Sequence, residues 1–145
     1  MKLPKELLNG ILIFIGIALY FLLMTILGYE NVTFLRVFNI IFVFYGVNRT
    51  IQMNLAEGKK VFVTNAVSAM MTSLVGVLLS IIGLLIYSNM KGGDSYVQSL
   101  SETFLFGGNP TVNTYCISLL FEGIASTIIV TLLLMLYWND RHVAD

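Results

Sequence analysis

One uncharged stretch, residues 61–87, constrains the fold of this chain more than any other feature of the sequence. It holds no Asp, Glu, Lys or Arg, and it is longer than the roughly 20 apolar residues that span the hydrocarbon core of a bilayer. Small or hydroxylated residues recur at every fourth position: Thr64, Ser68, Thr72, Gly76 and Ser80. Residues four apart share one face of a helix, and small faces allow close helix contacts in membranes. The stretch therefore predicts a central packing helix of a membrane bundle.

The composition agrees with a membrane protein. Of the 145 residues, 57% are hydrophobic and 11% are charged, whereas a soluble domain carries about 25% charged residues. The net charge is zero. The chain therefore lacks the excess of basic residues that would indicate a nucleic-acid partner. The single cysteine, Cys116, excludes an internal disulfide, and the single histidine, His142, argues against a haem or metal site built on histidines. We expect one membrane domain over residues 1–145 and no cofactor.

Three further apolar runs flank the central stretch, at residues 7–27, 34–53 and 115–138. Each is long enough to cross a bilayer, and short connections between neighbouring helices favour antiparallel packing. The expected fold class is all-α, an integral membrane bundle of four antiparallel transmembrane helices.

The long loop at residues 88–114 carries one further pattern, over residues 95–106. Ser95 and Gln98 have the spacing of a capping box. Val97, Leu100 and Phe104 recur at helical spacing, and Phe104, Leu105 and Phe106 are expected to anchor the segment. The pattern predicts a short amphipathic helix that lies at the membrane surface.

The distribution of Lys and Arg predicts the orientation, because cytoplasmic loops are enriched in both. One side of the predicted bundle carries Lys2, Lys5, Arg49, Lys59, Lys60 and Arg141, and the other carries Arg36 and Lys91. Both termini are therefore expected on the cytoplasmic side.

Glu122 is the residue that raises a chemical question. It lies in the last apolar run, about seven residues from the outer end and thus roughly 10 Å deep at 1.5 Å per residue. A charged, unpaired acid there costs about 2.5–3.5 kcal/mol. Asn39 is expected at a similar depth and Arg36 slightly nearer the surface, so we hypothesise a buried polar cluster of these three residues. Such a cluster either fixes helix packing or handles protons or ions.

A second small face is predicted on the last helix, beside Glu122. It is formed by Gly123, Thr127 and Thr131. Together with the small face of residues 61–87, it gives the bundle more close-packing surface than four helices need to bury internally. A spare face for a partner is therefore expected.

The chain resembles a diffuse group of small four-helix membrane proteins from Bacteroidota, described only as a domain of unknown function. The likeness runs from residue 35 onward. It is carried by Leu35-Arg36-Val37-Phe38-Asn39 through Gly46, by Asn109-Pro110, by Phe121-Glu122-Gly123 with Ser126, and by Tyr137. The resemblance implies a multi-pass protein of a bacterial inner membrane and implies no activity.

Two functions are compatible with these patterns. The first is a small non-enzymatic subunit or accessory protein of a larger inner-membrane complex, whose partners are the lipid bilayer and other membrane subunits. The alternative is a homo-oligomeric ion- or proton-coupled transporter or channel that uses Glu122. An enzyme is not expected, because the sequence shows no nucleophile with a base, no paired acids and no phosphate-binding glycine loop.

Overall fold

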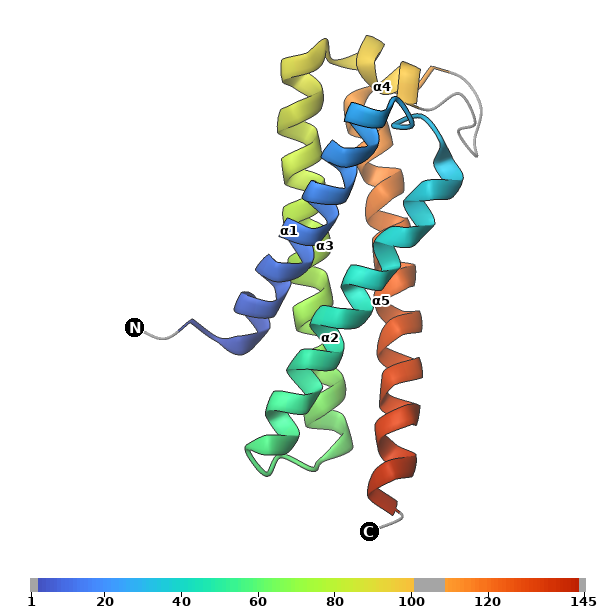
Figure 1. Ribbon diagram of the computed structural model, residues 1–145. Coiled ribbons are helices and arrows are strands. Elements are labelled where there is room, and N and C mark those ends of the chain that lie inside the picture. Colours follow the sequence, from blue (N-terminus) through green and yellow to red (C-terminus); the bar gives the residue numbers. More distant parts are fainter. Residues whose placement is uncertain (1–2, 101–108, 144–145) are drawn as a thin grey trace.

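The computed structural model describes residues 3–100 and 109–143 of the chain (Figure 1). Within these residues every regular element is a helix: α1 (Lys5–Leu27), the 3₁₀ helix η1 (Thr33–Phe38), α2 (Asn39–Ala56), α3 (Phe62–Lys91), α4 (Asp94–Leu100) and α5 (Val112–Val143). Four segments are long and apolar enough to cross a membrane: Lys5–Leu27, Phe34–Ala56, Phe62–Lys91 and Val112–Asp140. The prediction of an all-helical chain with four long apolar helices is confirmed.

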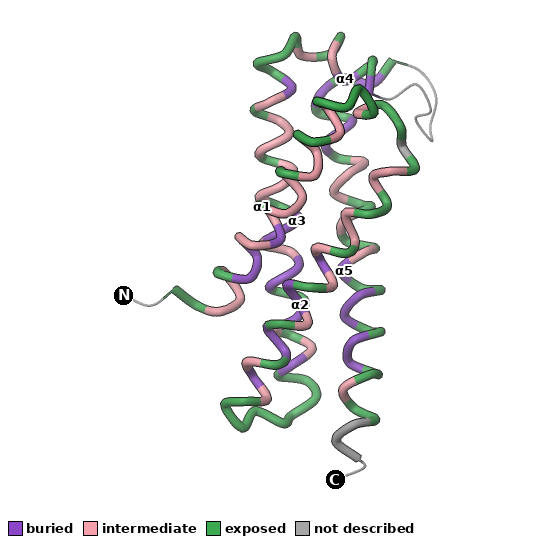
Figure 2. The backbone as a smooth tube through the Cα atoms, viewed as in Figure 1, coloured by how far each residue is buried: buried purple, intermediate pink, exposed green. Residues whose placement is uncertain are grey.

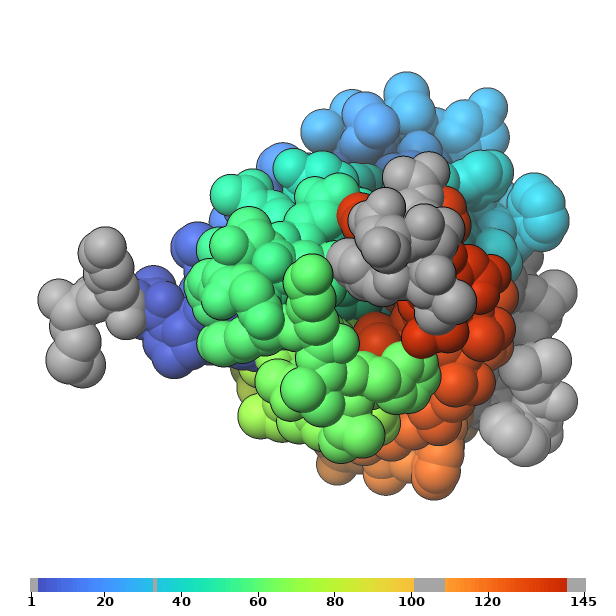
Figure 3. Space-filling model, turned by 90° about the horizontal axis from the view of Figure 1, so that it is seen from below, coloured from blue at the N-terminus to red at the C-terminus, as the bar shows by residue number. Residues whose placement is uncertain are grey.

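The long helices alternate in direction along the chain (Figure 1). The helix α3 packs against α1, α2 and α5, whereas α5 packs against α3 and α2. Seen from the end that carries the α2–α3 turn, the start of α1 and the end of α5 lie on opposite sides of α2 and α3 (Figure 3). The uncharged stretch thus forms the central helix of the bundle. One side of α5 faces away from the other long helices.

The sequence predicts one continuous α-helix over residues 34–53. The structure instead has two helical segments there. Residues Thr33–Phe38 form a 3₁₀ turn, and α2 begins at Asn39. The Tyr20 hydroxyl donates a hydrogen bond of 2.9 Å to the Leu35 carbonyl oxygen, while the Asn39 amide bonds to the Arg36 carbonyl three residues back. A side chain of α1 therefore takes an acceptor that an α-helical turn would have used, and the tighter i→i−3 pattern replaces it.

The helix α3 extends one turn beyond the predicted end at residue 87 and stops at Lys91. Gly92 and Gly93 follow with φ of +131° and +66°, a region that favours glycine over other residues. The Gly93 amide donates to the Ser88 carbonyl over 2.8 Å. The end of the helix is set by these glycines and not by the first polar residues.

The short helix α4 covers the first part of the segment predicted at residues 95–106. Val97 and Leu100 are buried, and they pack with Val112, Tyr115 and Cys116 of α5. The apolar side of α4 therefore covers the end of the bundle, and its position at a membrane surface stays a prediction. Phe104 and Phe106 lie outside the described residues.

The helix α5 begins at Val112, before the predicted start at residue 115, and runs past the predicted end at residue 138 to Val143. Asp94 of α4 explains the early start. Its Oδ1 atom accepts a hydrogen bond of 2.8 Å from the Val112 amide, which satisfies one of the free N–H groups at a helix N-terminus.

The main core lies along the facing sides of all four long helices, and its tightest contact is where α1, α2 and α3 meet. Ile13 is buried between Gly46 of α2 and Gly76 of α3. A Cβ atom at Gly76 would lie 2.6 Å from Ile13 Cγ2, and one at Gly46 would overlap Ile13 as well. The buried residues gather along these facing sides, with a second group beneath α4 (Figure 2). Glycine is required here because the backbones of three helices surround one isoleucine.

Candidate functional site

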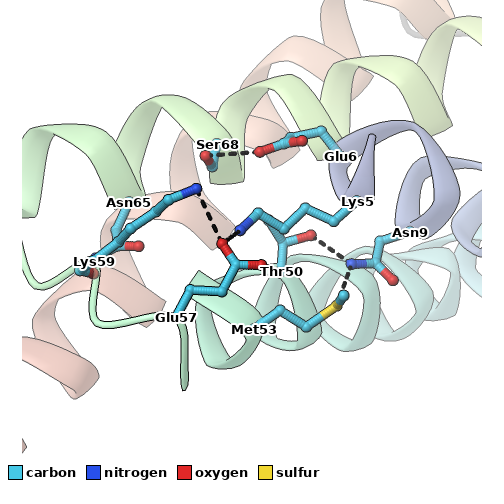
Figure 4. Close-up of polar contacts among 9 residues, drawn as sticks. All are labelled: Lys5, Glu6, Asn9, Thr50, Met53, Glu57, Lys59, Asn65 and Ser68. Carbon is cyan, nitrogen blue, oxygen red and sulfur yellow. Dashed lines mark hydrogen bonds and ion pairs between the residues drawn. The ribbon is translucent and has the colours of Figure 1, made fainter. Parts of the chain in front are cut away.

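A polar cluster joins α1, α2 and α3 inside the bundle (Figure 4). Asn9 Nδ2 donates to Thr50 Oγ1 over 2.9 Å, and the Thr50 and Thr72 hydroxyls share a hydrogen bond of 2.8 Å. All three side chains are fully buried. Because each residue comes from a different helix, the cluster fixes the register of the three helices against one another.

Charged residues continue this cluster toward the α2–α3 turn (Figure 4). Glu57 Oε2 lies 2.5 Å from Lys5 Nζ and 3.0 Å from Lys59 Nζ. The hydrogen bond from Lys5, and after it the one from Lys59, lowers the pKa of Glu57 below its ordinary value. Ser68 Oγ donates to Glu6 Oε1 over 2.9 Å. The start of α1 is thereby tied to the end of α2 and to α3.

A second buried contact joins α3 to α5. The Ser73 and Thr127 hydroxyls share a hydrogen bond of 2.7 Å. Gly123 of α5 packs directly on Val77 of α3. Thr131 is buried one turn further on, and its hydroxyl has no hydrogen-bond partner in the described part of the chain. The predicted small face of α5 therefore faces the bundle.

The predicted stripe on α3 contacts neighbouring helices in its middle. Ser68, Thr72 and Gly76 do so, as described above. Thr64 is exposed, and Ser80 Oγ donates back to the Gly76 carbonyl of its own helix. The physical reason is that each step of four residues turns about 40° past a full helical turn. A stripe at every fourth position thus drifts off the packing face at both ends.

Arg36 and Glu122 are brought together, but at the surface of the bundle. Arg36 Nη2 lies 3.3 Å from Glu122 Oε2, and Arg36 Nη1 donates to the Tyr115 hydroxyl over 2.7 Å. The Glu122 side chain is 51% exposed and that of Arg36 is 24% exposed. The expectation of a buried carboxylate is therefore wrong. Glu122 lies about 100° around α5 from Gly123, which faces α3, so its side chain projects from the flank of the helix.

Asn39 does not join this pair. Its Oδ1 atom is buried and has no hydrogen-bond partner in the residues that the structure describes. Asn39 lines a hollow of about 20 Å³ together with Tyr20, Glu30 and Arg36, room for roughly one water molecule. Arg36 thus lies between this hollow and Glu122 of α5.

Sequence reasoning missed Asn9 and Glu6, which both contribute to the cluster in Figure 4. A polar amide near the start of an apolar run was the available signal, since an amide in a membrane helix needs a partner helix. In the described residues, no three His, Cys, Asp or Glu side chains gather as a metal site would require.

Comparison with protein-family models, with curated proteins and with solved structures yields no match to this chain. The resemblance to small membrane proteins of Bacteroidota stays a prediction.

Proposed function

We propose that this protein is a small non-enzymatic subunit or accessory protein of a larger complex in a bacterial inner membrane. One observation carries the proposal: the carboxylate of the Arg36–Glu122 ion pair is half exposed on the outward side of α5. The bilayer would surround the four long apolar helices, and a partner protein would cover the ion pair.

The physical argument starts from the cost of polar groups in lipid. An exposed surface salt bridge in water is worth about 0–1 kcal/mol, but ionised groups facing hydrocarbon are costly, and in membrane proteins they usually face protein or a water-filled cavity. On α5, Phe121 and Ile129 are exposed on either side of Glu122 along the chain. A carboxylate on such an apolar surface is accommodated most readily when another protein supplies polar groups to it.

The internal polar groups support the same proposal. Asn9, Thr50 and Thr72 bond to one another, and Ser73 bonds to Thr127. These groups hold the four helices together, which is the role of polar residues in membrane packing. The Arg36–Glu122 pair adds little to that internal packing, so it is the group best placed to act between proteins.

The alternative is a homo-oligomeric ion- or proton-coupled transporter or channel that uses Glu122. The exposure of its carboxylate favours this alternative too, since a coupling acid must be reached by its ion. Arg36 already neutralises the charge of Glu122 at 3.3 Å, and transport would have to break that contact in every cycle. We therefore rank the alternative second.

Affinity purification from membranes into lipid nanodiscs, at native expression, tests the proposal. The wild type, Glu122→Gln and the matched control Glu57→Gln would be compared by mass spectrometry of the proteins recovered. We expect stoichiometric partners with the wild type and the control, and about tenfold less partner with Glu122→Gln, equivalent to about 1.4 kcal/mol.

Recovery of the protein by itself, or with copies of itself only, would contradict the subunit proposal. Ion-flux measurements in vesicles with the wild type and Glu122→Gln would then test the alternative. Equal helix content of the variants by circular dichroism is the control for folding.

A further inference from the structure

The outward side of α5 carries an unused helix-packing seam. Its members follow one another at spacings of four and three residues: Ser118, Glu122, Ala125, Ile129, Leu132 and Leu136. All of them except the partly buried Ser118 are exposed. This alternation of four and three is the spacing of seams along which two helices pack at a small crossing angle. The face of α5 that packs on α3 is separate, since it contains Gly123 and Thr127.

The seam is narrowest around Glu122. Ser118 lies one turn before it and Ala125 one turn after it, and small residues at such positions let two helix backbones approach closely in a membrane. Close approach would bring Glu122 of α5 within reach of whatever group faces it. The seam and the ion pair therefore belong to one surface.

This surface carries a negative group, Glu122, beside a positive one, Arg36, so two copies of it can be complementary to each other. Glu122 uses Oε2 for its contact with Arg36, and its Oε1 atom has no contact within the described residues. Arg36 has five N–H donors, of which one bonds to the Tyr115 hydroxyl and one to Glu122. The surface thus presents both a spare acceptor and spare donors side by side, as a surface that binds its own copy must.

We infer that a second copy of this chain packs against α5 along this seam, about a twofold axis parallel to the membrane normal. Glu122 would accept hydrogen bonds from its own Arg36 through Oε2 and from the partner's Arg36 through Oε1. Two carboxylates and two guanidinium groups then form a network without net charge, and each ion pair is completed by the other copy. The inference rests on the proposed role of α5 as a docking surface and names its occupant. Other members of the complex would then bind the dimer, so Glu122→Gln would release them by separating the two copies.

Disulfide cross-linking in native membranes tests this inference. In a Cys116→Ser background, single cysteines would replace Ala125 or Ile129 on the seam, and Leu19 of α1 or Ile82 of α3 as exposed controls. After oxidation, we expect a product of twice the monomer mass at the two seam positions, in at least about tenfold greater yield than at the controls.

The ion pair is tested in the same assay. In the Ala125→Cys background, Glu122→Gln is expected to reduce the dimer yield about tenfold, and Glu57→Gln to leave it unchanged. Circular dichroism of each variant checks that the helices are intact.

The other possible results of the cross-linking distinguish a failure of this inference from a failure of the proposed function. A cross-link from the seam to a different protein would overturn the second copy and keep α5 as a docking surface. No product at either seam position would overturn the inference, and the affinity purification would then decide the proposed function independently. A dimer without further partners would support the inference and contradict the larger complex.

Discussion

At the scale of single residues, Thr72 and Thr64 allow a comparison between a hydroxyl that bonds to another helix and one that lies on the surface. Both belong to the same stripe on α3, but Thr72 bonds to Thr50 in the core, whereas Thr64 is exposed. We expect Thr72→Val, which keeps the shape of the side chain, to lower the free energy of unfolding by about 0.6–2 kcal/mol. Thr64→Val should change it by less than about 0.5 kcal/mol.

Unfolding in mixed detergent micelles measures both variants. Equal stability of Thr72→Val and Thr64→Val would show that the Asn9–Thr50–Thr72 hydrogen bonds do not hold the three helices together.

Glu57 gives the end of the bundle a dependence on acid. Lys5 first, and Lys59 second, lower the pKa of Glu57 from its ordinary value of 4.5. Because the folded pKa is the lower one, the stabilising contribution is present above pH 4.5 and is lost as the pH falls through the folded pKa. We expect Glu57→Gln to flatten the thermal midpoint plotted against pH in that acid range. The effect should be small, because the carboxylate is exposed to solvent.

Thermal scans of the wild type and Glu57→Gln at a series of acid pH values check this expectation. Parallel curves for the two proteins would contradict it.

At the scale of helices, Gly76 and Ile13 set the spacing of α1 and α3. A methyl group at Gly76 would meet Ile13 Cγ2 at 2.6 Å, so we expect Gly76→Ala to cost about 1–3 kcal/mol of stability. Gly83 is the matched control on the same helix, because a Cβ there meets only the ring edge of Phe14, at 3.0 Å.

A double-mutant cycle with Ile13→Gly isolates the contact, because the Ile13 Cβ atom itself would lie 2.7 Å from the new methyl group and only glycine removes it. We expect the double variant to be more stable than the sum of the single effects by about 1 kcal/mol or more, since the truncated side chain leaves room for the new methyl group. Additive effects on the free energy of unfolding would show that the stability lost in Gly76→Ala does not come from the contact with Ile13.

The helices could be predicted from the sequence because apolar runs of sufficient length leave few alternatives in a chain with so little charge. Their ends could not, because they depend on contacts between distant segments. The Tyr20 hydroxyl at Leu35 separates η1 from α2, and Asp94 starts α5 at Val112. Neither contact leaves a pattern in the local sequence.

The pairing of Arg36 with Glu122 was predictable from their depths in the two runs, and the structure places them 3.3 Å apart. The exposure of Glu122 was not predictable, since it depends on which face of α5 turns toward α3. Asn39 shares their depth, but its Oδ1 atom has no hydrogen-bond partner in the described residues, because depth along a helix says nothing about direction around it. Asn9 has its partners on two other helices, which the first run alone does not indicate.

At the scale of the whole molecule, the alternation of the four long helices predicts that both termini emerge on one side of the membrane (Figure 1). The excess of Lys and Arg on that side predicts that it is the cytoplasmic one. Reporter proteins fused to either end should both be active in the cytoplasm. A cytoplasmic reporter at one end and an external one at the other would contradict the arrangement.

The central claim is that a protein, and not lipid, covers the outward side of α5 around Glu122. Site-specific photo-cross-linking in native membranes tests it most directly, with the photoreactive residue at Ile129 of α5 and, as the control, at Leu19 of α1, both of which are exposed. We expect a protein adduct at Ile129 and lipid adducts at Leu19. Lipid adducts alone at both positions would contradict it.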